Sequence, residues 1–247
     1  GMLISAMVGI DSRATMDIDT TLRNYPLNCE SAEQIVRQIA DVEIDDKISF
    51  VIKKTEEIME DSEYQGVRLS LDAYLDKTRI PLKIDISTGD VITPCEISFS
   101  YQLMFENRTI PLLAYPPETV LAEKLETILS RGEANTRLRD FYDVYILQRE
   151  DFVVTPDALC HALLATCRKR GHEDLLHTYA SILDRVRQSD TMRTQWMKYQ
   201  SDFDYAAGIT WDTVLDTVET LCMKTLDDHA FGDELPQEES QFEMHLL

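Results

Sequence analysis

The spacing of apolar residues changes about halfway along the chain. In three successive segments, residues 48–53, 67–75 and 80–86, apolar residues occupy alternate positions. Period two is typical of strands with one buried face, so these segments predict three strands joined by polar turns, and a shorter one is expected at 110–114. A mixed or antiparallel sheet with a helix against its apolar face would bury them economically.

Helical spacing dominates the rest of the chain. Residues 3–8 and 31–42 predict two early helices, the second with Ser31 as its cap. After Pro116 and Pro117, apolar residues recur at intervals of three and four, which predicts helices at residues 120–131, 137–148, 156–168, 173–187, 191–199 and 211–224.

These patterns predict an α+β fold in which a sheet-rich half precedes a helical half. We expect a sheet domain over residues 1–115 and a helical domain over residues 116–228. Residues 229–247 hold five acidic residues and no Lys or Arg, so we expect a tail that is mobile or only loosely docked. Trp196 and Trp211 lie in helical surroundings and are expected in the core.

The net charge of −21, from 45 acidic and 24 basic residues, limits the partners that the chain can attract. A field of this sign repels nucleic acid and anionic membranes, so any nucleic-acid substrate would need a local basic patch. Residues 168–170 with Arg185 and Arg187 are the candidate patch; solvated helix ends are the alternative.

The cysteines and the apolar residues near the N-terminus are informative about the cellular compartment. Five cysteines, an odd number widely spread, do not resemble a disulfide framework and predict a reducing cytoplasm. The apolar residues 3–8 lack a basic leader and are too few to cross a bilayer, so neither a signal peptide nor a membrane anchor is expected. The spacing of Cys160, His161, Cys167, His172 and His177 fits no familiar zinc finger.

Asp17 and Asp19 are the first candidate functional residues. In a strand they share one face, where two like charges repel each other. A divalent cation such as Mg²⁺, which is often held by one or two carboxylates and substrate phosphates, would explain the pair. A solvated edge strand whose charges discourage aggregation is the alternative.

Further charged residues extend this candidate site. Lys83 and Asp85 point the same way from a strand that could lie beside the first, and a third carboxylate would suit metal-dependent phosphoryl or nucleotidyl transfer. A solvent-facing pair is the alternative. Among the predicted helices, Lys124 and Arg131 share a face and could contact a triphosphate. Asp140 and Asp143 lie one turn apart, as in surface helices with ion pairs.

Four ordered motifs within residues 3–148 resemble those of the AbiEii/AbiGii nucleotidyltransferase toxins, in the DNA polymerase β-like superfamily. They are Arg13-Ala14-Thr15-Met16-Asp17-Ile18-Asp19, Lys83-Ile84-Asp85, Leu121-Ala122-Glu123-Lys124-Leu125 with Arg131, and Arg139-Asp140-Phe141-Tyr142-Asp143. The resemblance implies Mg²⁺-dependent transfer of a nucleotide from an NTP to an acceptor, which is tRNA for some members. It also implies a toxin controlled by a separately encoded antitoxin.

The resemblance also implies roles for single residues. Asp17, Asp19 and Asp85 match the metal-binding carboxylates, with Lys83 beside the third. Lys124 and Arg131 match the basic residues at the nucleotide phosphates. Asp140 and Asp143 match the last motif, which positions the nucleotide or acceptor or braces Lys124 and Arg139.

The superfamily has a Gly-Gly or Gly-Ser pair before its first carboxylates, where the backbone approaches the triphosphate. Here that pair would fall at Gly1 and the residue before it, so either the start was assigned too far downstream or the phosphate-gripping turn is lost. This leaves two alternatives to transfer: a catalytically impaired nucleotide-binding or interaction protein on the same fold, and a phosphotransferase acting on a protein or small molecule.

Overall fold

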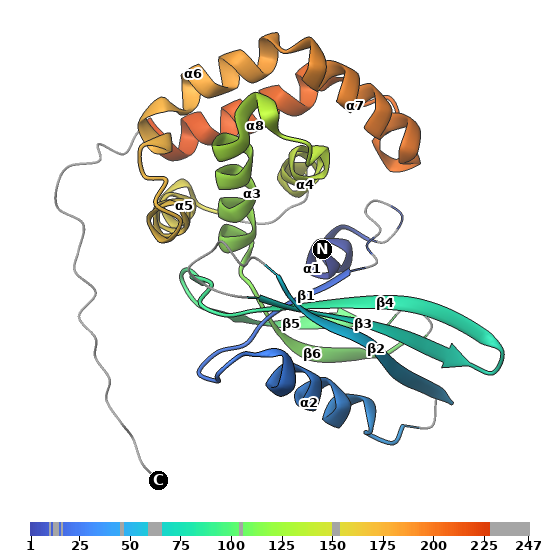
Figure 1. The fold of residues 1–247 in the computed structure, drawn as a ribbon. Coiled ribbons are helices and arrows are strands. Elements are labelled where there is room, and N and C mark those ends of the chain that lie inside the picture. Colours follow the sequence, from blue (N-terminus) through green and yellow to red (C-terminus); the bar gives the residue numbers. More distant parts are fainter. Residues whose placement is uncertain are drawn as a thin grey trace.

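The structure, a computed structural model, describes residues 1–9, 11, 15, 17–44, 47–58, 66–103, 106–149 and 154–227 (Figure 1). The predicted acidic tail at residues 229–247 lies outside these ranges, as do Arg13, Ala14 and Met16 of the first motif.

A four-stranded mixed sheet forms the first half of the fold and confirms the predicted α+β class. Its order is β1-β4-β3-β2, with β1 parallel to β4 and the other neighbours antiparallel. The strands are β1 (Asp17–Thr21), β2 (Ile48–Ile58), β3 (Gly66–Leu75) and β4 (Thr78–Ser87). The predicted strands at 48–53, 67–75 and 80–86 are therefore confirmed.

A second, two-stranded sheet corrects the prediction of a single sheet. It pairs β5 (Ile97–Gln102) with β6 (Thr109–Ala114) in antiparallel register. The pattern at 110–114 predicts β6, whereas β5 lies outside the predicted strands. The signal was present, because Ile97, Phe99 and Tyr101 alternate with polar residues and are half-buried.

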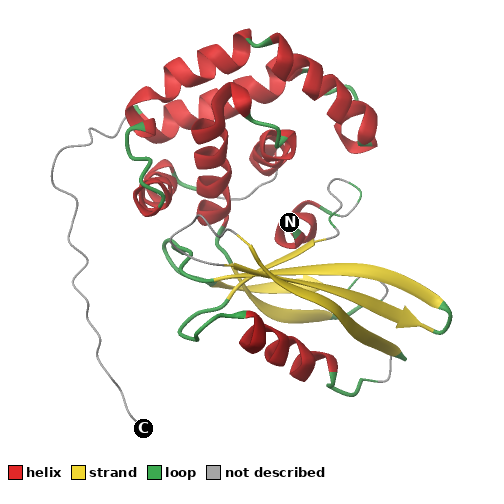
Figure 2. Cartoon of the chain, viewed as in Figure 1, coloured by secondary structure: helices red, strands yellow, loops and turns green. Residues whose placement is uncertain are grey.

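One face of the mixed sheet is covered by α2 (Cys29–Ala40). Ala32 and Val36 of this helix pack against Val67, Leu69 and Leu71 of β3. Alternation then directs the intervening side chains of the strands toward the opposite face, where the helical half lies (Figure 2).

The predicted cap of this helix is wrong by three residues. Asn28 is the N-cap: its side chain accepts a hydrogen bond from the backbone N–H of Ser31 at 2.8 Å, and the Ser31 hydroxyl accepts one from the N–H of Asn28 at 2.9 Å. This reciprocal capping box satisfies two backbone donors that have no partner within the helix. Ser31 thus lies inside the first turn.

We expect Asn28→Ala to lower the free energy of unfolding by about 1 kcal/mol, because the backbone N–H of Ser31 at the helix start loses its partner. Urea denaturation followed by circular dichroism measures the change. Asn107→Ala, at an exposed position between β5 and β6, is the control for a general effect of losing an asparagine. Equal stability of Asn28→Ala and wild type would contradict the capping role.

All of the helices predicted after residue 116 are present. The chain forms α1 (Met2–Val8) at its start and, after β6, α3 (Pro117–Arg131), α4 (Leu138–Arg149), α5 (Pro156–Lys169), α6 (Leu175–Gln188), α7 (Asp190–Asp202) and α8 (Trp211–Leu226). Gly132, with φ of 48°, ends α3. In the described ranges no helix is both long and apolar enough to cross a membrane.

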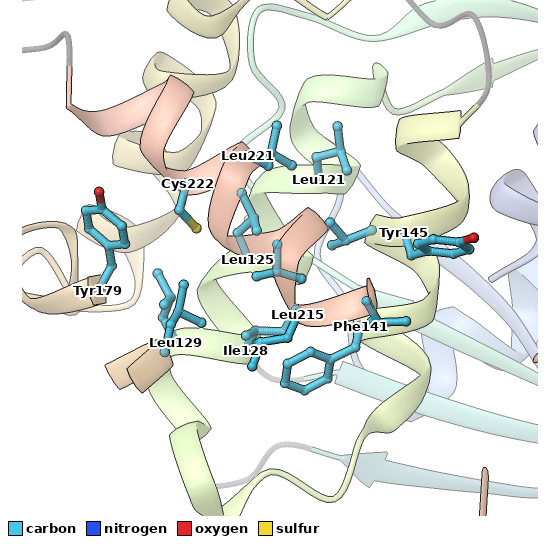
Figure 3. Close-up of a cluster of buried hydrophobic side chains, with 14 of the residues drawn as sticks. Leu121, Leu125, Ile128, Leu129, Phe141, Tyr145, Tyr179, Leu215, Leu221 and Cys222 are labelled. Carbon is cyan, nitrogen blue, oxygen red and sulfur yellow. The ribbon is translucent and has the colours of Figure 1, made fainter. Parts of the chain in front are cut away.

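The buried apolar side chains form two clusters. One lies between α2 and the mixed sheet, and the larger one joins the helices, with Leu125, Phe141 and Leu215 near its centre (Figure 3). Trp196 and Trp211 are buried in this larger cluster, as predicted. Ile4 of α1 also packs there, so the first helix connects the N-terminal segment to the helical half.

Two residues of the predicted basic patch pair with neighbouring carboxylates. Arg187 bonds to Asp216 at 2.7 Å and Glu219 at 2.6 Å. Arg170 pairs with Glu123 and Glu126. The charges of Arg170 and Arg187 are therefore committed within the helical half, so these two residues do not support the acceptor-binding interpretation.

Candidate active site

The parallel pairing of β1 with β4 brings the predicted carboxylates together. In this register Asp17 lies opposite Lys83, and Asp19 lies opposite Asp85. Residues opposite each other on adjacent strands share a face and are about 5 Å apart. The prediction that the two strands lie side by side is confirmed.

Asp17, Asp19 and Asp85 line one pocket of about 800 Å³ between the sheet and the helices. Its sheet-side wall also includes Ile58 and Arg68. The lining from the helical half consists of Lys124, Thr136, Arg137, Leu138, Arg139, Asp140, Gln195, Lys198, Tyr199 and Asp202, and Gly1 and Thr15 complete it.

Arg68 of β3 holds Asp85 with both ends of its guanidinium. Its Nε and Nη2 donate to the two carboxylate oxygens at 2.7 and 2.6 Å. Arg68 lies opposite Asp85 in the antiparallel register, so this fork follows directly from strand pairing. The bonds to Asp85 are the largest cause that raises the pKa of Arg68, so the cation is permanent. Arg68 is not among the site residues predicted from the sequence, because its partner can be found only once the strand register is known.

Lys124 of α3 is bound to the two aspartates of α4. Its Nζ lies 2.6 Å from Oδ1 of Asp140 and 3.4 Å from Oδ2 of Asp143, and the side chains of these aspartates are 2% and 0% exposed. Burial lowers the pKa of Lys124, but the two carboxylates outweigh it, and the pKa lies above its ordinary value. This arrangement agrees with the expectation that the last motif braces Lys124.

Arg137 adds a second cation to Asp140. Its Nε lies 3.1 Å from Oδ2 of Asp140. The two groups form an ion pair without the geometry of a hydrogen bond. Asp140 therefore compensates Lys124 and Arg137 at once.

Three predicted site residues do not line the pocket. Lys83 lies on β4, as predicted, but its side chain is exposed to solvent and is not part of the lining. Asp143 is buried behind Lys124. Arg131 is exposed at the end of α3 that lies away from the sheet (Figure 1). Seven residues of helix place it about 10 Å further along the axis than Lys124.

The wall formed by α7 was not expected from the sequence. Gln195, Lys198, Tyr199 and Asp202 of this helix face the pocket. These residues are far from Asp17 in the sequence. Their spacing is common to amphipathic helices in general, so it does not indicate a functional site. Only the packing of α7 against α4 brings them to the site.

The chemistry of the carboxylates suits a hard cation, although the predicted three-carboxylate cluster is not preformed. Asp17 and Asp19 are exposed on one face of β1 and offer the oxygen ligands that Mg²⁺ prefers. Within the described residues, however, no group of three His, Cys, Asp or Glu side chains is close enough to hold a metal. Both oxygens of Asp85 are bonded to Arg68.

Gly1 lies where the backbone comes close to these carboxylates. A Cβ atom at this position would lie 2.8 Å from Oγ1 of Thr15 and 3.1 Å from Oδ2 of Asp19. α1, which starts next to it, lies between the sheet and α4 (Figure 1). A side chain would crowd the Thr15 hydroxyl and the Asp19 carboxylate, so the position favours glycine.

Comparison with known proteins places this geometry in context. The family model described as nucleotidyl transferase AbiEii toxin of type IV toxin–antitoxin systems matches residues 1–217. Among curated proteins, none matches the chain. A solved structure of a candidate nucleotidyltransferase from H. pylori is similar at 12% identity and a TM-score of 0.38, over 92% of this chain and 96% of that chain.

Proposed function

This chain belongs to the AbiEii nucleotidyltransferase toxins of type IV toxin–antitoxin systems, and from this premise we propose that it transfers a nucleotide from an NTP to an acceptor with the help of Mg²⁺. The carrying observation is that Asp17, Asp19 and Asp85 line one pocket from paired strands. In this proposal the pocket holds the nucleotide, and the acceptor hydroxyl enters from the open side.

Asp17 and Asp19 are the proposed ligands of the metal. Exposed on one strand face, they leave room for the substrate phosphates that complete the coordination of Mg²⁺ in nucleotide sites. When bound, the ion would neutralise phosphate charge and stabilise the charge that develops during transfer.

Asp85 is the proposed third carboxylate, and Arg68 orients it. Each carboxylate oxygen has more than one lone pair, so Asp85 can keep its bonds to Arg68 and still accept from a further group. Arg68 thereby fixes the orientation of the Asp85 carboxylate. Asp140, buried against Lys124, is proposed to hold α3 and α4 in register at the pocket wall.

The acceptor and the partners belong to the same proposal. We propose tRNA as the first acceptor to test, on the strength of the family resemblance alone, and a separately encoded antitoxin as the partner. A cytoplasmic location is supported by the five cysteines, which are all free thiols in the structure.

The proposal predicts that the full-length protein attaches label from an α-³²P-labelled NTP to tRNA, and that removal of Mg²⁺ with EDTA stops the reaction. Each of the four NTPs is incubated with total tRNA, and the products are separated on a denaturing gel. Addition of excess Mg²⁺ after EDTA is the control and should restore transfer.

The other functions give different results in the same assay. Retention of nucleotide by the protein without transfer to tRNA or any other RNA would favour the impaired, nucleotide-binding alternative. Label that reaches an acceptor from γ-³²P-NTP and never from α-³²P-NTP would identify a phosphotransferase. Transfer that persists in EDTA would contradict the role of the metal.

A further inference from the structure

The charged side chains of the pocket are not equally available to a ligand. Its lining includes the acidic residues Asp17, Asp19, Asp85, Asp140 and Asp202 and the basic residues Arg68, Lys124, Arg137, Arg139 and Lys198. Any phosphate group that enters must be attracted by these cations, since the protein as a whole carries a charge of −21.

Three of the five cations are already compensated by carboxylates. Arg68 is committed to Asp85 through two hydrogen bonds. Lys124 and Arg137 both pair with Asp140. A phosphate could recruit these cations only at the cost of leaving a carboxylate without its partner, and for Asp140 that carboxylate is buried.

Arg139 of α4 is held by an aromatic ring and not by a carboxylate. Its guanidinium carbon lies 5.4 Å from the centre of the Phe203 ring, at the end of α7. Stacking on a ring fixes the plane of the guanidinium while its N–H groups remain available at the edges. Within the described residues no carboxylate oxygen lies within ion-pair distance of it.

Lys198 of α7 is the fifth cation, and its side chain is exposed toward the pocket. Asp202, four residues later, also lines the pocket, yet Lys198 forms no ion pair with it or with any other residue that the structure describes. Lys198 and Arg139 therefore form the part of the lining, on α4 and α7, where positive charge is uncompensated.

We propose that Arg139 and Lys198 form an anion subsite that binds the triphosphate of the NTP across the pocket from Asp17 and Asp19. This inference rests on the proposed function and changes which residues carry it: the subsite takes the part that the sequence assigned to Lys124 and Arg131. Arg139 supplies a planar fork for phosphate oxygens, and Lys198 supplies a mobile point charge. The triphosphate then lies between these cations and the carboxylates that bring the metal.

The subsite also gives α7 a role. This helix packs against α4 and lines the side of the pocket that faces the sheet. The pocket is therefore complete only when the helical half and the sheet are both in place. Substrate binding would thus depend on residues from both halves of the chain.

The test compares Lys198→Ala, Arg139→Met and Lys198→Arg with wild type in the full-length protein. We expect the first two to weaken binding of Mg-ATP and of inorganic tripolyphosphate by about 10- to 100-fold each, the usual effect of losing a hydrogen bond to a charged group. Lys198→Arg should keep most of the affinity. Equilibrium dialysis measures binding without any need for turnover, and in the transfer assay KM should rise more than kcat falls.

Lys224→Ala is the matched control, because Lys224 is an exposed helix lysine on α8 outside the pocket lining. It should leave binding unchanged. Thermal unfolding of every variant shows that a loss of binding is not a loss of structure.

Different results separate the subsite from the proposed function. If wild type transfers nucleotide while both Lys198→Ala and Arg139→Met bind Mg-ATP as wild type does, the subsite is wrong and the function stands. If these variants lose affinity for tRNA alone, the cations contact the acceptor and the subsite is equally wrong. If wild type binds neither Mg-ATP nor tripolyphosphate, the proposed function fails and the subsite with it.

Discussion

Replacing Asp17 and Asp19 together with asparagine is expected to reduce nucleotide transfer by at least about a thousandfold while the protein remains folded. Loss of a catalytic metal removes several kcal/mol of charge stabilisation, and each 1.36 kcal/mol is about a factor of ten in rate. Both side chains are exposed and contribute nothing to the apolar clusters, so the fold should not depend on them.

The double variant is measured by transfer from α-³²P-labelled NTP and by titration with Mg²⁺ in the presence of ATP. Asparagine keeps the size of the side chain and removes only its charge. Asp184→Asn, at an exposed position on α6 outside the pocket, is the matched control and should retain full activity. Activity within a few-fold of wild type in the Asp17→Asn/Asp19→Asn protein would exclude these residues as the metal site.

Lys124→Met is expected to have the largest effect on stability, a loss of about 3–5 kcal/mol. The change leaves Asp140 and Asp143, at 2% and 0% side-chain exposure, without the ammonium group between them. Removal of one partner from a buried ion pair costs about this much, because the remaining charge stays in a medium that solvates it poorly. Urea denaturation monitored by tryptophan fluorescence is suitable, since Trp196 and Trp211 are buried in the same half.

The pH dependence gives an independent check on this pair. The folded-state pKa of Lys124 is raised, so its stabilising contribution is complete below the unfolded pKa of about 10.4 and is lost only as pH rises above that value. The contribution of the Lys124 charge to the stability of the wild-type protein should therefore be constant across the neutral range.

A second substitution tests the physical reason. Adding Asp140→Asn to Lys124→Met removes one of the orphaned charges and should restore part of the stability. Two results would contradict this bracing role of Lys124 and Asp140. In the first, Lys124→Met is as stable as wild type. In the second, Asp140→Asn lowers the stability of Lys124→Met by as much as it lowers that of wild type.

Local patterns in the sequence were sufficient for most of the elements. Period two located β2, β3, β4 and β6, and period 3.6 located the helices after residue 116, because each of these segments buries one of its faces. β5 was overlooked although it alternates, and the cap of α2 was misplaced because Asn28 and Ser31 are both good capping residues.

For the candidate site, too, residue spacing predicted only part of the arrangement. Spacing alone predicts that Asp17 and Asp19 share a strand face and that Asp140 and Asp143 share a helix face, whereas only the family resemblance placed the second pair at the site. Lys124 and Arg131 also share a helix face by spacing, yet only Lys124 lines the pocket. Spacing predicts direction but not how far a helix extends from the site.

By itself, the sequence determined which side chains point together: the carboxylates of β1, the charged residues of β4, and the aspartates of α4. Strand and helix periodicity depends only on local backbone geometry, and that geometry is encoded within a few residues. Only the tertiary structure decided which of these charges meet. Arg68 reaches Asp85 through strand register, Lys124 is enclosed by Asp140 and Asp143 through helix packing, and α7 brings Lys198 to the pocket. Such pairings join residues far apart in the chain, and they are settled by the burial of the two apolar clusters, which no local pattern specifies.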